Sequence, residues 1–204
     1  MERRTRLGVM GGTFDPIHHG HLMAAEEARW QFELDEVVFV PTGRPWMKEG
    51  EPVSPAEDRY LMVVIATSSN PSFMVSRLEI ERDGPTYTVD TLRAIREERG
   101  DVDLFFITGA DAMLEILQWK DPEEALELAH FIAATRPGYD LSAFEAGAPT
   151  EDPRVSVMNI PALAISSTDV RERVAAGRPI RYLVPDGVQT YISKAGLYRD
   201  GGSG

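Results

Sequence analysis

The chain contains no cysteine among its 204 residues, which excludes disulfides and thiolate metal sites. No apolar run approaches the roughly 20 residues that a membrane-spanning helix needs. The first residues are basic but lack the apolar stretch of a signal peptide, so we expect a cytoplasmic location. Basic residues are also few, because 21 Lys and Arg stand against 33 Asp and Glu, giving a net charge of −12. This balance argues against a nucleic-acid-binding protein, but a local basic cluster could still hold a small anionic ligand.

Histidine is equally scarce, yet three of the four histidines lie together at His18, His19 and His21. They follow Gly11 and Gly12, which come directly after an apolar run at residues 6–10 that predicts a buried strand. Residues 22–30 are rich in helix-forming types, so a helix is expected to begin at the histidines. A strand, a glycine turn and a helix N-terminus form a layout that binds mononucleotides, because free N–H groups there face a phosphate.

Two other interpretations of the histidine cluster stay open. Imidazole is a common ligand of zinc and nickel, so the cluster could form a metal site. Metal ligands on a helix favour a spacing of four residues, whereas His18 and His21 are three apart. The cluster could also be a purely structural helix start, and of the three interpretations the sequence favours phosphate chemistry most.

Apolar runs alternate with amphipathic segments along the rest of the chain. This pattern predicts an α/β fold of the Rossmann-like, doubly wound class, with a mainly parallel sheet, helices on both faces and a small C-terminal helical portion. We expect one domain over residues 1–200 and a flexible tail at 201–204. Further strands are expected at 36–41, 73–75, 103–107, 130–134 and 155–158. One helix is expected at 87–99, and another with Ser54 as its cap and Pro55 as its first residue. Two more helices are expected, one beginning at Asp121 and one after a Ser-Ser-Thr cap at 166–168. Residues 139–153 are expected to form a loop or a poor helix.

Two motifs resemble those of the bacterial nicotinate-nucleotide adenylyltransferases, members of the T/H-x-G-H nucleotidyltransferase superfamily. The first is H-H-G-H at residues 18–21, preceded by G-G-T-F-D-P-I, and the second is I-S-S-T-D-V-R at residues 165–171. The segment T-Y-T-V-D-T-L at 86–92, and Trp119 eight residues after G-A-D at 109–111, resemble the nicotinate branch. The resemblance covers residues 6–195, and it departs from the common form in one loop, where P-W-M-K at 45–48 replaces Pro-His-Lys.

The resemblance implies transfer of an adenylyl group from ATP, with Mg²⁺ bound to the ATP, to nicotinate mononucleotide. The products would be deamido-NAD and pyrophosphate, and the partners would be small molecules, with a homo-oligomer possible and neither nucleic acid nor membrane involved. By resemblance, the catalytic residues are His18, His21, Lys48 and Arg171. The ATP-binding residues are Gly11, Gly12, Thr13, Phe14, His18, Gly20, His21, Gly109, Asp111, Ile165, Ser166, Ser167, Thr168 and Arg171. The nicotinate-nucleotide-binding residues are Asp15, Lys48, Thr86, Thr88, Trp119 and Arg136.

Several of these residues have simpler structural interpretations. The Ser-Ser-Thr run could serve merely as a helix cap, and Lys48 could be a solvent-exposed charge in a loop. Trp119 could be a core aromatic, and Thr86 and Thr88 could reflect β-propensity and capping. Other functions also stay open: a sibling enzyme that uses nicotinamide mononucleotide or phosphopantetheine as acceptor, or a nucleotide sensor without catalysis.

Overall fold

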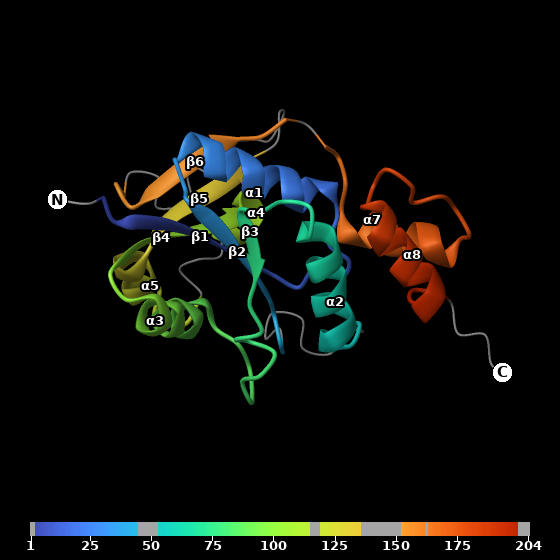
Figure 1. Cartoon of the computed structure of the whole chain (residues 1–204), viewed down its shortest axis with the longest axis horizontal. Coiled ribbons are helices and arrows are strands. Elements are labelled where there is room, and N and C mark those ends of the chain that lie inside the picture. The colour runs from blue at the N-terminus through green and yellow to red at the C-terminus, as the bar shows by residue number, and fades with distance from the viewer. Residues whose placement is uncertain (1–2, 45–52, 115–118, 136–151, 162, 200–204) are drawn as a thin grey trace.

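The computed structural model describes residues 3–44, 53–114, 119–135, 152–161 and 163–199. Six parallel strands form one sheet in the order β3-β2-β1-β4-β5-β6 (Figure 1). The strands are β1 (Thr5–Gly12), β2 (Glu36–Pro41), β3 (Phe73–Val75), β4 (Val102–Gly109), β5 (His130–Thr135) and β6 (Val155–Asn159). The chain winds outward from β1 in one direction and from β4 in the other, so the strand order reverses between them. Open parallel sheets bind ligands at such a reversal, beyond the carboxyl ends of the strands.

Alternate residues of each strand enter different cores, as expected when both faces of a sheet are covered. On β2, Val37 and Phe39 pack into one core, whereas Val38 and Val40 pack into the other. The first core is covered by α1 (His19–Gln31), α2 (Ala56–Thr67), α7 (Ser167–Ala175) and α8 (Asp186–Ala195). The second is covered by α3 (Thr88–Arg99), α4 (Ala110–Met113) and α5 (Pro122–Leu128). The predicted doubly wound α/β fold is therefore confirmed.

The helix starts show where local sequence signals decide the fold and where they do not. Ser166 caps α7 as predicted, because its side chain accepts a hydrogen bond from the backbone N–H of Asp169 at 3.1 Å. The predicted cap at Ser54 is wrong, since α2 begins at Ala56 and its N-cap residue is Pro55. The backbone N–H of Ser54 donates to the distant Asp15, and its carbonyl accepts from Arg59 in the first turn of α2.

Some predictions concern residues outside the described ranges. These are the tail at 201–204, most of the loop at 42–50, and most of the segment at 139–153. Across the ranges that the structure describes, every helix is too short or too polar to cross a membrane.

Candidate active site

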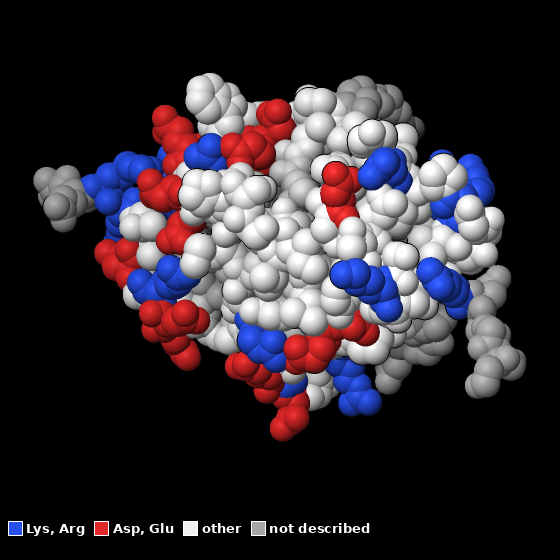
Figure 2. Space-filling view, turned by 45° about the vertical axis from the view of Figure 1, so that its right-hand side comes forward, with Lys and Arg blue, Asp and Glu red and all other residues white. Residues whose placement is uncertain are grey.

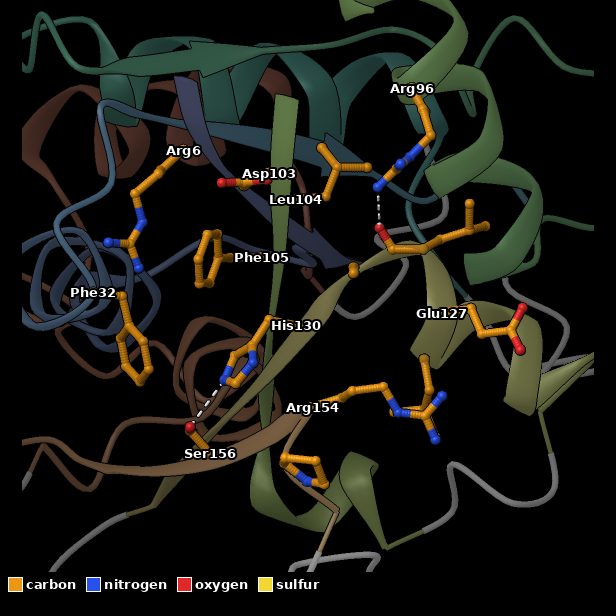
Figure 3. A pocket seen from close by; sticks show the side chains of 14 residues that line it. Arg6, Phe32, Arg96, Asp103, Leu104, Phe105, Glu127, His130, Arg154 and Ser156 are labelled. Carbon is orange, nitrogen blue, oxygen red and sulfur yellow. Dashed lines mark hydrogen bonds between the residues drawn. The ribbon is translucent and has the colours of Figure 1, made fainter. Parts of the chain in front are cut away.

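One cavity of about 540 Å³ opens at the amino ends of the central strands (Figure 3). Its polar groups already bond to the protein: Arg96 donates to the Leu128 carbonyl at 2.7 Å, and His130 bonds the Ser156 hydroxyl at 2.9 Å. The guanidinium of Arg154 likewise donates hydrogen bonds to the Asp152 carboxylate. Burial lowers the pKa of His130, and the charge of nearby Arg6 lowers it further. With its donors occupied and its histidine neutral, this cavity is a poor anion site.

A second cavity of about 420 Å³ lies at the opposite end of the sheet. It is placed by the carboxyl ends of β1 and β4, which run side by side with Met10 paired to Ile107. This is the point at which the strand order reverses, where the fold itself predicts a ligand. The lining residues come from β1, the start of α1, the β4–α4 junction, β5, the segment after β6 and the start of α7: Met10, Gly11, His18, Gly20, His21, Ala24, Ile107, Thr108, Gly109, Ala110, Asp111, Ala112, Ala134, Ile160, Leu163, Ile165, Ser166 and Ser167.

The predicted histidine pair stands on the wall of this cavity. His18 is the N-cap residue of α1, and its ring stacks on that of His21 with 3.8 Å between the ring centroids. The buried Phe14 ring packs edge-on against His21 with its centroid 5.1 Å away. The first turn of α1 therefore brings the two imidazoles together, and the Phe14 ring packs against that of His21.

Two glycines near this pair, Gly12 before it and Gly20 within it, are tightly packed against aromatic rings. A side-chain carbon at Gly20 would approach the His18 ring to 3.0 Å, and one at Gly12 would approach the Phe14 ring to 3.0 Å. Such contacts are too close for a well-packed side chain, so larger residues would displace the rings. Glycine at these positions preserves the arrangement of residues 18–21, here called the histidine turn. It would also let the backbone approach a phosphate.

The protonation state of His21 follows from its surroundings. Burial lowers the pKa of His21 well below its ordinary value of 6.5, and the adjacent His18 lowers it further. The backbone N–H of His18 donates to Nδ1 of His21 at 3.3 Å. Because Nδ1 accepts, the single proton of the neutral ring is assigned to Nε2. His21 is thus a neutral hydrogen-bond donor at pH 7.

This lowered pKa predicts a stability change on acidification. Below pH 6.5 the His21 side chain binds a proton in the unfolded protein but stays neutral in the folded protein. The free energy of unfolding should therefore fall as the pH falls. The loss should be at most about 1.4 kcal/mol per pH unit. Denaturant unfolding of the wild type and of His21→Asn, measured from about pH 8 to about pH 5, checks this. The wild type should lose more stability than the variant over that range, and parallel curves would contradict the assignment.

The second motif reaches the site through the first turn of α7. Ser166 and Ser167 line the cavity, and the Ser167 hydroxyl donates to the Pro16 carbonyl at 2.9 Å. Arg171 lies beyond the cavity wall, where Nη1 donates to the Asp15 carbonyl at 2.8 Å and Nη2 to the Thr168 hydroxyl at 3.3 Å. The two motifs, about 150 residues apart in the sequence, are therefore joined directly by hydrogen bonds.

The residues that are predicted for the nicotinate nucleotide and that the structure describes are absent from the cavity lining. Thr86 is buried and its hydroxyl donates to the Arg44 carbonyl at 3.3 Å, while Thr88 is the first residue of α3. Trp119 packs against Phe106 in the second core, with 6.0 Å between ring centroids. Its indole N–H is buried and meets no acceptor within the described part of the chain. Asp15 is buried in the turn before His18, and Lys48 and Arg136 lie outside the described residues.

Arg59 is a residue of the site's framework that sequence reasoning missed. Its side chain is only 1% exposed, and it donates to the carbonyls of Thr13 at 2.7 Å, Ser54 at 3.0 Å and Gly43 at 3.2 Å. These carbonyls belong to the loop before the histidine turn and to the ends of the segment after β2. The only local signal would have been an arginine on the apolar face of a helix, at a position that otherwise predicts a core residue.

Comparisons with known proteins show the family of this chain. Residues 9–173 match the family model described as cytidylyltransferase-like. A relative from Leifsonia xyli, named "Probable nicotinate-nucleotide adenylyltransferase", is 64% identical over 96% of this chain and 95% of its own. The chain belongs to the nicotinate-nucleotide adenylyltransferase family. A second member of that name, from Corynebacterium glutamicum, is 58% identical over 100% of this chain and 93% of its own.

Solved structures show the same fold for this adenylyltransferase family at much lower identity. A Plasmodium falciparum nicotinic acid mononucleotide adenylyltransferase, complexed with NaAD, is 22% identical with a TM-score of 0.79, covering 95% of this chain and 97% of its own. The match to the cytidylyltransferase-like family ends at residue 173. The adenylyltransferase relatives cover nearly the whole chain, so the part beyond residue 173, including α8, is shared with them.

Proposed function

We propose that the cavity at the carboxyl ends of β1 and β4 transfers the adenylyl group of ATP to nicotinate mononucleotide. Membership of the nicotinate-nucleotide adenylyltransferase family supports this reaction. The observation that carries it is the His18–His21 pair, stacked at the helix N-terminus that faces the strand-order reversal. The neutral imidazole of His21, beside His18 at the positive end of the α1 dipole, suits a phosphate on which negative charge increases during reaction.

The reaction needs no strong base at this site. An oxygen of the nicotinate mononucleotide phosphate, already anionic, attacks the α-phosphorus of ATP and forms a new P–O bond. The bond from the α-phosphorus to the bridging oxygen breaks, and pyrophosphate leaves with the electron pair. Catalysis then depends on alignment and on charge stabilisation. His21 would donate through Nε2, and His18 would act beside it on the same α-phosphate.

The remaining predicted residues divide between the two ends of the substrates. Ser166, Ser167 and Thr168 would hold the triphosphate with backbone N–H and hydroxyl groups, together with Arg171. Gly109 and Asp111, at the end of β4, would contact the adenosine, where a carboxylate can accept from ribose hydroxyls. The residues proposed for the nicotinate nucleotide remain Asp15, Lys48, Thr86, Thr88, Trp119 and Arg136.

The charge distribution is compatible with anionic substrates despite the acidic composition. Residues 167–199 carry six Lys or Arg and three Asp or Glu, whereas the whole chain has a net charge of −12. In Figure 2 several basic side chains lie on the right of the molecule, and acidic ones are frequent on the left and lower margins. A locally positive region beside α7 can attract a triphosphate at distances shorter than about 10 Å.

Mg²⁺ would arrive bound to the triphosphate and waters, because it keeps several waters and needs few protein ligands. The cavity lining fits such a metal, since its single carboxylate is Asp111. When bound, Mg²⁺ would neutralise part of the charge on the phosphate oxygens. Asp111 is the residue that could approach it, directly or through a water.

A single acceptor assay tests the proposed function. The purified protein is incubated with ATP and Mg²⁺ together with nicotinate mononucleotide, nicotinamide mononucleotide or phosphopantetheine, and pyrophosphate release is measured. We expect release with nicotinate mononucleotide and much less with the other two. Release only with another acceptor would indicate a sibling enzyme. Tight nucleotide binding without release from any acceptor would instead indicate a sensor.

A further inference from the structure

The C-terminal part of the chain forms hydrogen bonds to the histidine turn and to Asp15 just before it. The backbone N–H of His19, the first residue of α1, donates to the Leu183 carbonyl at 3.0 Å. The hydroxyl of Tyr198 donates to Oδ1 of Asp15 at 2.6 Å, which is a short hydrogen bond to a carboxylate. One bond reaches the first residue of α1 and the other reaches the turn before it, and both come from residues after α7. The C-terminal segment therefore contacts this part of the site at two points.

Asp15 is the residue through which these contacts could act. It is 3% exposed, and its second carboxylate oxygen, Oδ2, accepts from the backbone N–H of Ser54 at 3.1 Å. Its backbone carbonyl accepts from Arg171 at 2.8 Å. Only two residues separate Asp15 from His18. A shift of this carboxylate would therefore move the start of α1 and the guanidinium of Arg171 together.

Tyr198 is itself firmly placed. Its backbone lies in the left-handed region with φ 62°, which a non-glycine residue adopts only where its surroundings hold it. Burial raises the pKa of Tyr198, and the hydrogen bond to Asp15 raises it further. The hydroxyl thus remains a donor at neutral and moderately alkaline pH. With Asp15, Ser54 and Arg171 it also lines a cavity of about 510 Å³ beside the second motif.

We propose that Tyr198 is a positioning residue for adenylyl transfer. By holding the Asp15 carboxylate, it fixes the orientation of the turn that carries His18 and His21 and of Arg171. This inference rests on the proposed function. It assigns to the C-terminal segment a part in the reaction beyond closing the first hydrophobic core.

The chain offers a matched control for the test. Tyr191, on α8, also donates its hydroxyl to a carboxylate, that of Asp58 at 2.7 Å, but Asp58 lies on α2 and not in the turn between β1 and α1. Tyr198→Phe and Tyr191→Phe therefore each remove one hydroxyl–carboxylate bond and keep the ring. We expect Tyr198→Phe to lower kcat for pyrophosphate release by about ten- to a hundredfold, since a displacement of about 1 Å can cost a hundredfold. KM for both substrates should change less than about threefold, and Tyr191→Phe should retain the wild-type kcat.

A second measurement separates this inference from the proposed reaction. The ring proton NMR signals of His18 and His21 should shift in Tyr198→Phe and stay in place in Tyr191→Phe, whether or not the protein turns over. Shifted rings with a lowered kcat support the inference. Equal kcat values in the two variants, or unmoved histidine signals in Tyr198→Phe, would overturn it. Absence of turnover in the wild type with every acceptor would overturn the proposed function alone, and the NMR comparison would still decide the role of Tyr198.

Discussion

Replacing His18 with alanine is expected to lower kcat by about 10²–10³-fold while changing the affinity for ATP much less. Loss of one preorganised donor to a developing charge typically has an effect of about this size. The contact strengthens as charge builds on the α-phosphate, so its loss appears mainly in the chemical step. Steady-state kinetics with ATP and nicotinate mononucleotide give kcat, and binding of a non-reactive ATP analogue gives the affinity separately.

Two further variants separate this chemistry from the folding of the turn. His18 is also the N-cap residue of α1, and His18→Asn supplies a good capping residue without the imidazole. If catalysis is lost because of the missing ring, His18→Asn should be nearly as slow as His18→Ala. His19→Ala removes the neighbouring imidazole, which is absent from the cavity lining, and its backbone bond to Leu183 persists. It should keep kcat within about threefold of the wild type, since it removes no donor that faces the α-phosphate. An unchanged kcat in His18→Ala would exclude the proposed role of this residue.

The sequence predicted those parts of the fold that depend on local patterns. The apolar runs at β1 and β4 and the helix former-rich segment after His21 are short-range signals, and the structure confirms each of them. The resemblance assigned both motifs to ATP, and parallel strands bring their carboxyl ends to one edge of the sheet. Their direct contact through the Ser167 hydroxyl and the Pro16 carbonyl follows from that arrangement.

What the sequence could not predict is the network that holds these loops from a distance. Tyr198 bonds to a residue 183 positions earlier, and Arg59 bonds to a carbonyl 46 positions earlier. No periodicity or spacing connects such partners, because their proximity arises only when the sheet and both helix layers have formed. The neutral state of His21 is similar, since it depends on burial and on a stacked neighbour. Local motifs thus indicate the chemistry, whereas the tertiary fold determines the orientation and charge of the groups.

Arg59→Met is the substitution expected to destabilise the fold most. Methionine fills much of the same volume but leaves the carbonyls of Thr13, Ser54 and Gly43 without the donors that they now have. It also removes a cation from the neighbourhood of two buried carboxyl groups, those of Asp15 and Glu79. Removing one partner from a buried charged network typically costs about 3–5 kcal/mol. We therefore expect the free energy of unfolding in denaturant to fall by about that amount.

Arg77→Met provides the comparison that isolates burial as the cause. Arg77 also donates three hydrogen bonds, to the carboxylates of Glu57 and Glu81, but these pairs lie at the surface. Solvent replaces such bonds when they are lost, so this variant should unfold almost like the wild type. The two arginines differ mainly in burial, because the Arg59 side chain is almost fully buried whereas that of Arg77 is 37% exposed. Similar losses of stability in Arg59→Met and Arg77→Met would show that the three carbonyls bound by Arg59 find other donors, and that the loop before His18 does not depend on Arg59.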